Sequence, residues 1–414
     1  MTSSLNTHFT NQIISFALNL SFVLYAALLP FSYAFSIHTG PIFLLLLWLA
    51  EGNMRKKKKI LLRNKAILFF LLFFIVHICS LLWSHHFHTA LHTLKFYFTI
   101  LVIISILYTS LQRSFIPYIL IAFLLSMFVS EVLLYGVFFE WWHFKNASSA
   151  NPSPIMHHIF YSIFVAVTIL LLLWQIFNPK ISYKIKILEL FFLISTTTNL
   201  FLNGGRTGQL GFIFALFVFT INLFGFKKKY LLATSAILAI LFISGYRLSP
   251  VFHAKVHQGV SDIQKMMHGD LNTSWGLRVA MKKVGFQIVK DHPLLGVGVG
   301  DVLATFQSYL QKSKEKKYAF LFTVNHVHDQ WLQILLQTGI IGLAFFILFL
   351  LHLFKIPFDD PLTKATFHAI LTIFIVAFFT DVPLRNFTAA LFGFIIGFFL
   401  AISRLHTHPE EVKL

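Results

Sequence analysis

Apolar runs of about 20 residues recur along most of the chain and are separated by short polar segments. An α-helix needs a run of about this length to cross the hydrocarbon core of a bilayer. The second run is short and contains Pro41. The pattern predicts twelve spans, at residues 11–33, 36–50, 66–84, 96–112, 115–138, 155–177, 187–202, 208–225, 229–246, 328–354, 365–382 and 386–403.

Composition agrees with an all-α polytopic membrane protein. The chain is 57% hydrophobic and 12% charged, whereas soluble domains are about 25% charged. The first run follows a polar segment without Lys or Arg and lacks a small-residue cleavage site, so we expect a retained helix and not a signal peptide. Because Cys79 is the only cysteine, a disulfide within the chain and a cysteine-based metal site are excluded.

The formal charge of +18 is distributed unevenly between the predicted loops. Short loops on one side hold 18 basic residues, those opposite hold four, and the long segment 247–327 holds the other 11. Lys and Arg in short loops collect on the cytoplasmic side, so both termini are expected inside. The charge therefore indicates topology and not nucleic-acid binding. The expected division is spans one to nine in 1–246, an outer loop in 247–327, and spans ten to twelve with a cytoplasmic tail in 328–414.

The outer loop contains one clear helical pattern. Thr273 is followed by WGLRVAMKKVGFQIVK, whose apolar positions recur at helical spacing, which predicts an amphipathic helix at the membrane surface. Pro293 cannot continue it. The GVGVGD turn at 296–301 is not a dinucleotide fingerprint, because no strand of a βαβ unit precedes it.

The stretch 324–343, VNHVHDQWLQILLQTGIIGL, joins polar residues to a membrane span. If Asn325 caps the helix, His328 falls in its first turn, where the helix dipole favours the neutral imidazole that a general base requires. Asp329 also suits a helix N-terminus, and a lone interfacial histidine is usually structural. One polar face, expected to line a wet cavity or the protein interior, comprises His326, Gln330, Gln333 and Gln337.

Two arginines could bind an anion. Gly204 and Gly205 precede Arg206 in a tight turn, where free amides and a helix N-terminus attract phosphate. A cation is unfavourable at a helix N-terminus by itself, so Arg206 fits better with an anion beside it; the alternative is a snorkelling side chain. Arg278 offers a bidentate fork for phosphate, or else contacts lipid headgroups, as is expected for Lys282 and Lys283.

Other polar groups carry weaker signals. The intramembrane carboxylates Glu131 and Glu189 lie near span ends, which disfavours an ion-coupled transporter. His157 and His158 lie at an outer boundary and could contact substrate. Four histidines follow the third span: His85, His86, His88 and His92. Because no carboxylate or cysteine lies near them in the sequence, a metal site is not expected, and an interfacial helix is favoured.

These residues resemble the O-antigen ligases of lipopolysaccharide assembly, whose superfamily includes O-antigen polymerases and protein O-oligosaccharyltransferases. The ligase signature is His, then Asn, Ser or Gln, nine residues, and GxxG. His328, Gly339 and Gly342 match its spacing, while Asp329 departs from its second position. The family's periplasmic arginines are matched by Arg206 and Arg278.

The resemblance implies a GT-C-like glycosyltransferase that works at the periplasmic face of the bacterial inner membrane without metal or other cofactor. It implies inverting transfer of a glycan from undecaprenyl pyrophosphate to a sugar hydroxyl of lipid A–core, within a layer of membrane lipids. Arg206 and Arg278 would stabilise the pyrophosphate, and His328 would activate or position the hydroxyl. A polymerase, a protein glycosyltransferase and a lipid-linked glycan transporter remain alternatives. Further expected substrate contacts are Gly204, Gly205, His326, Asp329 and Gln330.

Overall fold

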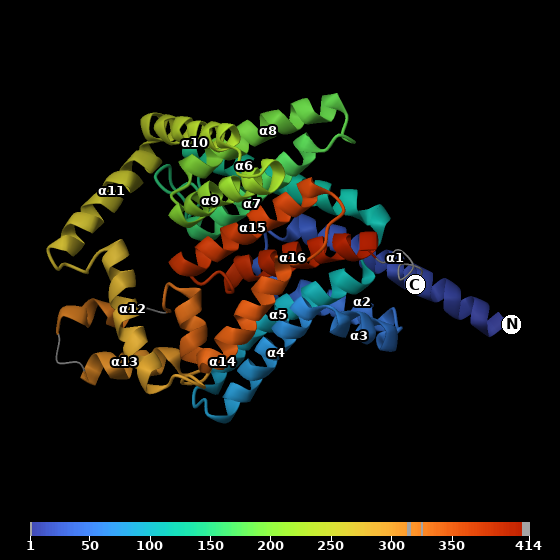
Figure 1. Cartoon of the computed structure of the whole chain (residues 1–414), viewed down its shortest axis with the longest axis horizontal. Helices are drawn as coiled ribbons and strands as arrows, with labels where there is room; N and C mark the ends of the chain where they lie inside the picture. The colour runs from blue at the N-terminus through green and yellow to red at the C-terminus, as the bar shows by residue number, and fades with distance from the viewer. Residues whose placement is uncertain (1, 313–315, 324–325, 408–414) are drawn as a thin grey trace.

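The computed structural model describes residues 2–312, 316–323 and 326–407, and helices dominate all three segments (Figure 1). Within this part of the chain the only strand-like feature is an isolated bridge between Ser148 and Asn151. The expected all-α polytopic class is therefore confirmed.

Within the described residues, eleven helices, two of them together with an adjoining 3₁₀ turn, are long and apolar enough to cross a bilayer. They are α1 (Thr2–Leu28), α4 (Lys65–Cys79), α5 (Phe87–Ser110), α6 (Ile116–Phe138), α7 (His158–Phe177), α8 (Tyr183–Leu202), α9 (Arg206–Phe224), α10 (Lys228–Leu248), α14 (Gln330–Leu353), α15 (Pro361–Thr380) and α16 (Asn386–Thr407). The 3₁₀ turns η2 (Ser80–Leu82) and η3 (Arg113–Phe115) adjoin α4 and α6. These helices correspond to eleven of the twelve predicted spans.

The predicted second span, 36–50, ends at a sharp bend. A π-helical turn, η1 (Phe35–Thr39), leads into α2 (Gly40–Ala50), and α3 (Met54–Arg63) follows at an angle of 118°. The bend falls at Gly52 and Asn53, which both have positive φ. The described part of the chain thus has a twelfth span only if this pair is counted as one.

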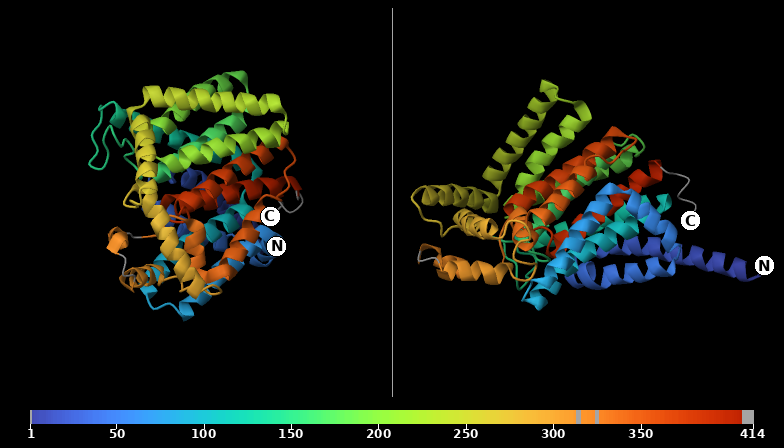
Figure 2. Two further views of the ribbon diagram at one scale, coloured as in Figure 1. Left: turned by 60° about the vertical axis from the view of Figure 1, so that its left-hand side comes forward. Right: turned by 60° about the horizontal axis from the view of Figure 1, so that its bottom comes forward.

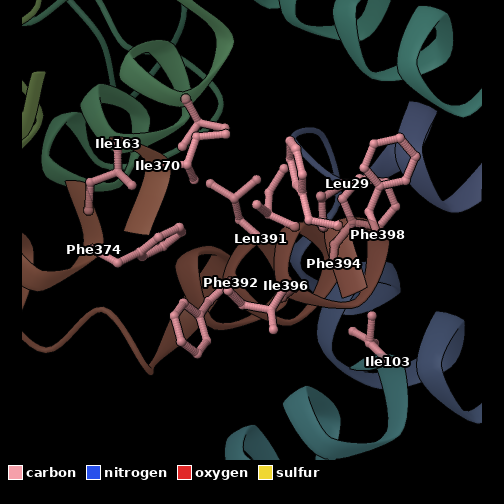
Figure 3. Packing of buried hydrophobic residues seen from close by; sticks show 14 of the residues in the cluster. Leu29, Ile103, Ile163, Ile370, Phe374, Leu391, Phe392, Phe394, Ile396 and Phe398 are labelled. Atoms are coloured by element: carbon pink, nitrogen blue, oxygen red, sulfur yellow. The ribbon is translucent and has the colours of Figure 1, made fainter. Parts of the chain in front are cut away.

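Helix α16 is the most deeply buried of these helices, and Figure 3 shows side chains from it packed among those of its neighbours. In α16, 89% of the apolar stretch that could span the membrane is buried inside the protein. In α10, which lies at the edge of the bundle, the corresponding share is 11%. Side chains such as Leu391 and Phe394 belong to one cluster with Ile103 of α5, Ile163 of α7 and Ile370 of α15. Burial of each such side chain stabilises a soluble fold by about 2 kcal/mol, but in lipid close packing is the main contribution.

Helices of the segment 247–327 gather at one end of the bundle, which we call the α12 end (Figures 1 and 2). They are α11 (Pro250–Met267), α12 (Ser274–Asp291), α13 (Val302–Lys312) and η4 (Lys316–Thr323). The start of α1 and the end of α16 lie at the opposite end. Figure 2, left, shows α11 crossing the end of the bundle in a direction different from that of α10.

Helix α12 begins and ends where the sequence predicts. The Thr273 hydroxyl accepts the Gly276 N–H at 3.0 Å, and the last helical residue is Asp291. Its buried residues Ala280, Val284 and Ile288 share a cluster with residues of α13 and α14. One apolar face of α12 therefore packs against protein, and its location at a membrane surface stays a prediction.

Helix α14 is interrupted at Gly339, where φ is 60° and ψ is −157°. The break frees two carbonyl groups and one N–H from the helical pattern, and the turn 293–298 supplies their partners. The bonds run from Val297 N–H to Leu336 O (2.8 Å), from Gly298 N–H to Gln337 O (3.1 Å) and from Ile340 N–H to Pro293 O (2.9 Å). Because unpaired backbone groups are costly away from water, this turn and the break stabilise each other.

The break predicts that Gly339→Ala destabilises the protein. A Cβ there would lie 2.3 Å from the Leu294 carbonyl carbon, at a positive φ. Strain of this kind costs about 1–3 kcal/mol before the clash is counted. Thermal unfolding in detergent should show a clearly lower midpoint. The control is Gly259→Ala, where a Cβ meets open space; equal midpoints for the two variants would contradict the proposed role of the break.

Candidate functional site

A cavity of about 290 Å³ lies at the α12 end, between α7, α9, α11, α12 and α15. Its basic lining residues are Arg206, Lys255, Arg278 and Lys282. Arg206 and Arg278 are 72 positions apart in the sequence, and the fold brings both to one cavity. Lys255, on α11, was not singled out from the sequence.

Neutral oxygens hold both guanidinium groups in place. Arg206 donates to the Lys255 carbonyl at 2.7 Å and to Gln258 Oε1 at 3.1 Å. Arg278 donates through Nε to the Thr380 carbonyl at 3.1 Å and through an Nη to the Ser274 carbonyl at 2.7 Å. Burial lowers the pKa of Arg278, which the charge of Asp381 partly offsets, but an arginine stays protonated in proteins. The positive charges are thus oriented without being neutralised by a bonded carboxylate.

The glycines before and within α9 serve mainly for packing. The Gly205 N–H donates to Asn203 Oδ1 at 2.7 Å. A Cβ at Gly205 would lie 2.4 Å from the His158 carbonyl oxygen, and one at Gly208 would lie 2.2 Å from the Ser162 carbonyl oxygen. The two glycines therefore let α9 approach α7. The expectation of a turn with free amides does not hold at Gly205, whereas Gly204 does line the cavity.

Asp381, directly after α15, contacts both histidines of the 324–343 stretch. Its Oδ1 lies 3.1 Å from His328 Nδ1 and 3.6 Å from His326 Nε2, and it accepts the Val382 N–H at 2.8 Å. The Asp381 side chain is 5% exposed and that of His328 is 23% exposed. Burial would raise the pKa of Asp381, but the imidazoles and the Val382 N–H outweigh it and hold this pKa well below its ordinary value. The carboxylate is therefore ionised and bound to the histidines.

Sequence reasoning missed Asp381. It lies 53 positions from His328, and no periodicity connects the two residues. The available signal was a lone carboxylate between two apolar spans, followed by Val382 and Pro383. Such a residue is also an ordinary helix terminus, so only the fold distinguishes the two roles.

Helix α14 begins later than expected. Asp329 is its N-cap, and its Oδ1 accepts the Leu332 N–H at 2.9 Å. The placement of His328 in the first turn was therefore wrong, and Asn325 lies outside the described residues. The other Asp329 oxygen is 2.7 Å from Lys282 Nζ, so Lys282 belongs to the site and is not simply a contact for lipid headgroups.

The glutamines of α14 face the protein interior, one of the two environments expected. Gln330 Oε1 accepts the Leu384 N–H at 3.1 Å, and Gln337 Oε1 accepts the Tyr97 hydroxyl at 2.9 Å. Gln333 lines a second, smaller cavity beside His326. His326 itself precedes the helix, so it does not continue the glutamine stripe.

The neighbouring histidines have separate surroundings. His158 lines the 290 Å³ cavity, and its ring lies 4.0 Å from that of His157. Burial lowers the pKa of His157. His85 and His86 each contact one oxygen of Asp301, at 2.9 and 2.7 Å, so a carboxylate does lie near the histidines that follow the third predicted span. These contacts connect the α4–α5 turn to the start of α13.

A different set of side chains has the spacing of metal ligands. The donor atoms of His326, His328 and Asp381 all lie within 4.8 Å of one another. Two imidazoles and one carboxylate form a common ligand set for zinc and related ions. The same atoms also make a complete hydrogen-bonded group without metal, so geometry alone fits both.

An apolar groove runs beside the site. It encloses about 740 Å³ between α6, α7, α8, α9 and α10. Its lining extends from Phe224 and Tyr230 to Leu202 and Ser249. The latter two are within a few residues of Gly204 and Lys255, which line the basic cavity. The groove thus extends along the bundle towards the cationic residues.

A family model described as O-antigen ligase matches residues 190–347. The matched region contains Arg206, Arg278, His328 and the Gly339 break. A comparison with curated proteins found no match. The predicted resemblance to the O-antigen ligase superfamily is therefore confirmed over residues 190–347.

Proposed function

We propose that the protein transfers a glycan from undecaprenyl pyrophosphate to a sugar hydroxyl of lipid A–core, at the periplasmic face of the bacterial inner membrane. The superfamily supports an enzyme of the O-antigen ligase and polymerase type. The observation that carries the proposal is the meeting of Arg206 and Arg278 in one cavity, next to the segment that holds His328 on Asp381.

The arginines suit a diphosphate leaving group. In this reaction the acceptor oxygen bonds to the anomeric carbon with inversion, and the bond from that carbon to the pyrophosphate oxygen breaks. The leaving lipid pyrophosphate takes the electron pair, so negative charge grows on its oxygens. Preorganised cations stabilise such charge in the transition state, and guanidinium forks match phosphate oxygens in pairs. Lys255 adds to the positive charge of the cavity, while Lys282 is paired with Asp329.

His328 is placed to take the proton of the attacking hydroxyl. Because an ionised carboxylate can only accept a hydrogen bond, the contact with Asp381 assigns the proton to His328 Nδ1. The other ring nitrogen, Nε2, is then the free base. Asp381 also stabilises the imidazolium that forms, as the carboxylate does in a Ser–His–Asp triad. Asp381 is thus a positioning residue in this proposal.

The apolar groove fits the lipid part of the donor. A long polyprenyl chain needs an apolar surface that starts beside the diphosphate site, and the groove ends near Gly204 and Lys255. Helix α10 forms one wall and is little buried by the rest of the protein. A chain could therefore enter sideways from the bilayer while its diphosphate reaches the arginines.

The first test of the proposed function is His328→Ala. Purified protein is given a lipid-pyrophosphate-linked glycan and lipid A–core without added metal, and the glycan is followed onto the acceptor. Removing a general base should slow transfer about 100-fold or more. The control is His268→Ala, at an exposed position after α11.

The products of that assay separate the candidate functions. Transfer to lipid A–core that depends on His328 supports a ligase. Longer glycans on the lipid carrier would instead show a polymerase, and transfer to a protein acceptor would show a protein glycosyltransferase. Glycan movement across vesicle membranes without bond formation, unaffected by His328→Ala, would support the transporter.

The second test concerns the geometry of Arg206. Arg206→Ala should lower the transfer rate about 100-fold or more, the effect of removing one such donor. Arg206→Lys should also be poor, because a point charge cannot replace the fork. Initial rates are compared with those of Arg247→Lys, at an exposed residue near the end of α10. Full activity of Arg206→Lys would contradict bidentate phosphate binding.

The third test concerns metal dependence. If arginines supply the positive charge, incubation with EDTA followed by removal of the chelator should leave the transfer rate unchanged. Loss of activity that zinc or another divalent ion restores would contradict metal independence. It would identify His326, His328 and Asp381 as a metal centre and remove His328 as the general base.

A further inference from the structure

Arg385, in the short connection between α15 and α16, has another cation nearby. Within the described residues its guanidinium group makes no hydrogen bond and no ion pair within 4.0 Å. Lys95, on α5, is close enough for its positive charge to repel that of Arg385. The attracting carboxylate is Asp381, one of whose oxygens already contacts two histidines.

This arrangement is unfavourable for the isolated protein. Burial lowers the pKa of Arg385, yet an arginine remains charged. A partly buried charge without a bonded partner destabilises a fold. Lys95 does not form an ion pair in the described part of the chain, and its ammonium group lies over the rings of Phe96 and Tyr33, at 5.0 and 6.0 Å from their centres. Such a group of cations is typical of a site that is completed by an anion.

A small cavity lies beside these cations. It has a volume of about 70 Å³, and its lining includes Arg385, His92, His326 and Gln333. Since one water needs roughly 10–15 Å³ of such space, the cavity can hold a group of a few heavy atoms. Gln333 is 8% exposed, and its Oε1 has no hydrogen-bond partner. The cavity therefore combines the Arg385 guanidinium group with a buried polar atom that can accept a hydrogen bond from a hydroxyl group.

The two cavities flank the histidine pair. Thr380 lines the 290 Å³ cavity and Val382 lines the smaller one, while Asp381 lies between them in an extended conformation. Asp381 holds His326, which lines the small cavity, and His328. A molecule can thus be anchored in the small cavity, on the side of Asp381 away from Arg206 and Arg278, while one of its hydroxyl groups reaches His328.

We propose that the small cavity is a subsite for the acceptor and binds an anionic group, a phosphate or carboxylate, on the acceptor saccharide. Arg385 is its main ligand, the nearby Lys95 adds positive charge, and Gln333 accepts a hydrogen bond from a neighbouring sugar hydroxyl. This inference rests on the proposed function, since it assigns the 290 Å³ cavity to the donor diphosphate. The subsite places the acceptor and takes no part in bond breaking.

Direct binding tests the subsite without requiring transfer. The probe is lipid A–core, used intact, after enzymatic removal of phosphate and after chemical reduction of its carboxyl groups. Its equilibrium binding to the full chain in neutral-lipid nanodiscs, without donor, is compared for wild type and Arg385→Gln. A charged hydrogen bond corresponds to about 1.5–3 kcal/mol, so binding should weaken about 10- to 100-fold. Arg247→Gln, at an exposed residue, is the matched control and should bind as wild type does.

The three forms of the probe identify the anion. Weaker binding of the phosphate-free form by wild type would identify a phosphate, and weaker binding of the carboxyl-reduced form would identify a carboxylate. Arg385→Gln should bind the form that lacks the recognised group and the intact probe equally weakly. Wild type that binds all three forms equally, or an Arg385→Gln variant that binds intact lipid A–core normally, would overturn the inference. Equal loss of binding for the lipid-pyrophosphate donor would also overturn it.

Stability provides an independent result. Because Arg385 is largely buried without a bonded partner and is repelled by Lys95, Arg385→Gln should unfold at the same or a higher temperature than wild type, whereas a structural arginine would give a lower one. Should this variant fail to fold, Lys95→Gln tests the same site and should weaken binding of the intact probe several-fold. Specific binding through Arg385 without any glycan transfer would remove the proposed enzyme and leave the binding site.

Discussion

The interruption of α14 at Gly339 imposes the constraint on which the α12 end depends. Two carbonyl groups and one N–H leave the helix there and bond to the turn 293–298. This turn connects α12, which carries Arg278, to α13, whose first residues follow Asp301. Asp301 in turn accepts N–H groups of His85 and His86 between α4 and α5. The helix break therefore helps to connect the segment 247–327 to α14 and to the turn between α4 and α5.

Hydrophobic periodicity was sufficient to predict most of this architecture, because bilayer thickness sets the length of every span. It did not predict the 118° bend after α2, which depends on two left-handed residues, Gly52 and Asn53. The glycines near Arg206 were also misinterpreted in part. An exposed amide and a close helix contact both require the absence of a Cβ, so the sequence cannot distinguish them, and the structure shows that Gly205 serves packing.

The candidate site was predictable where a motif carried it and not where the fold alone assembles it. Arg206, Arg278 and His328 could be proposed from local patterns and a family resemblance. Asp381 and Lys255 could not, since their roles depend on contacts between distant segments. The site also divides its charges: the two guanidinium groups are oriented by neutral carbonyls, Lys282 is paired with Asp329, and Asp381 is engaged by histidines. Because Asp381 is bound to histidines, it does not neutralise the positive charge of Arg206 and Arg278.

The apolar groove beside α10 has a kinetic consequence. A lipid-tailed molecule that occupies it approaches within the plane of the bilayer, so its effective concentration is a surface density: molecules per unit area of membrane. Added lipid or detergent enlarges that area and dilutes the molecule even when its bulk concentration is constant. The apparent affinity for such a substrate should therefore scale with its mole fraction in the lipid phase and not with the volume of the solution.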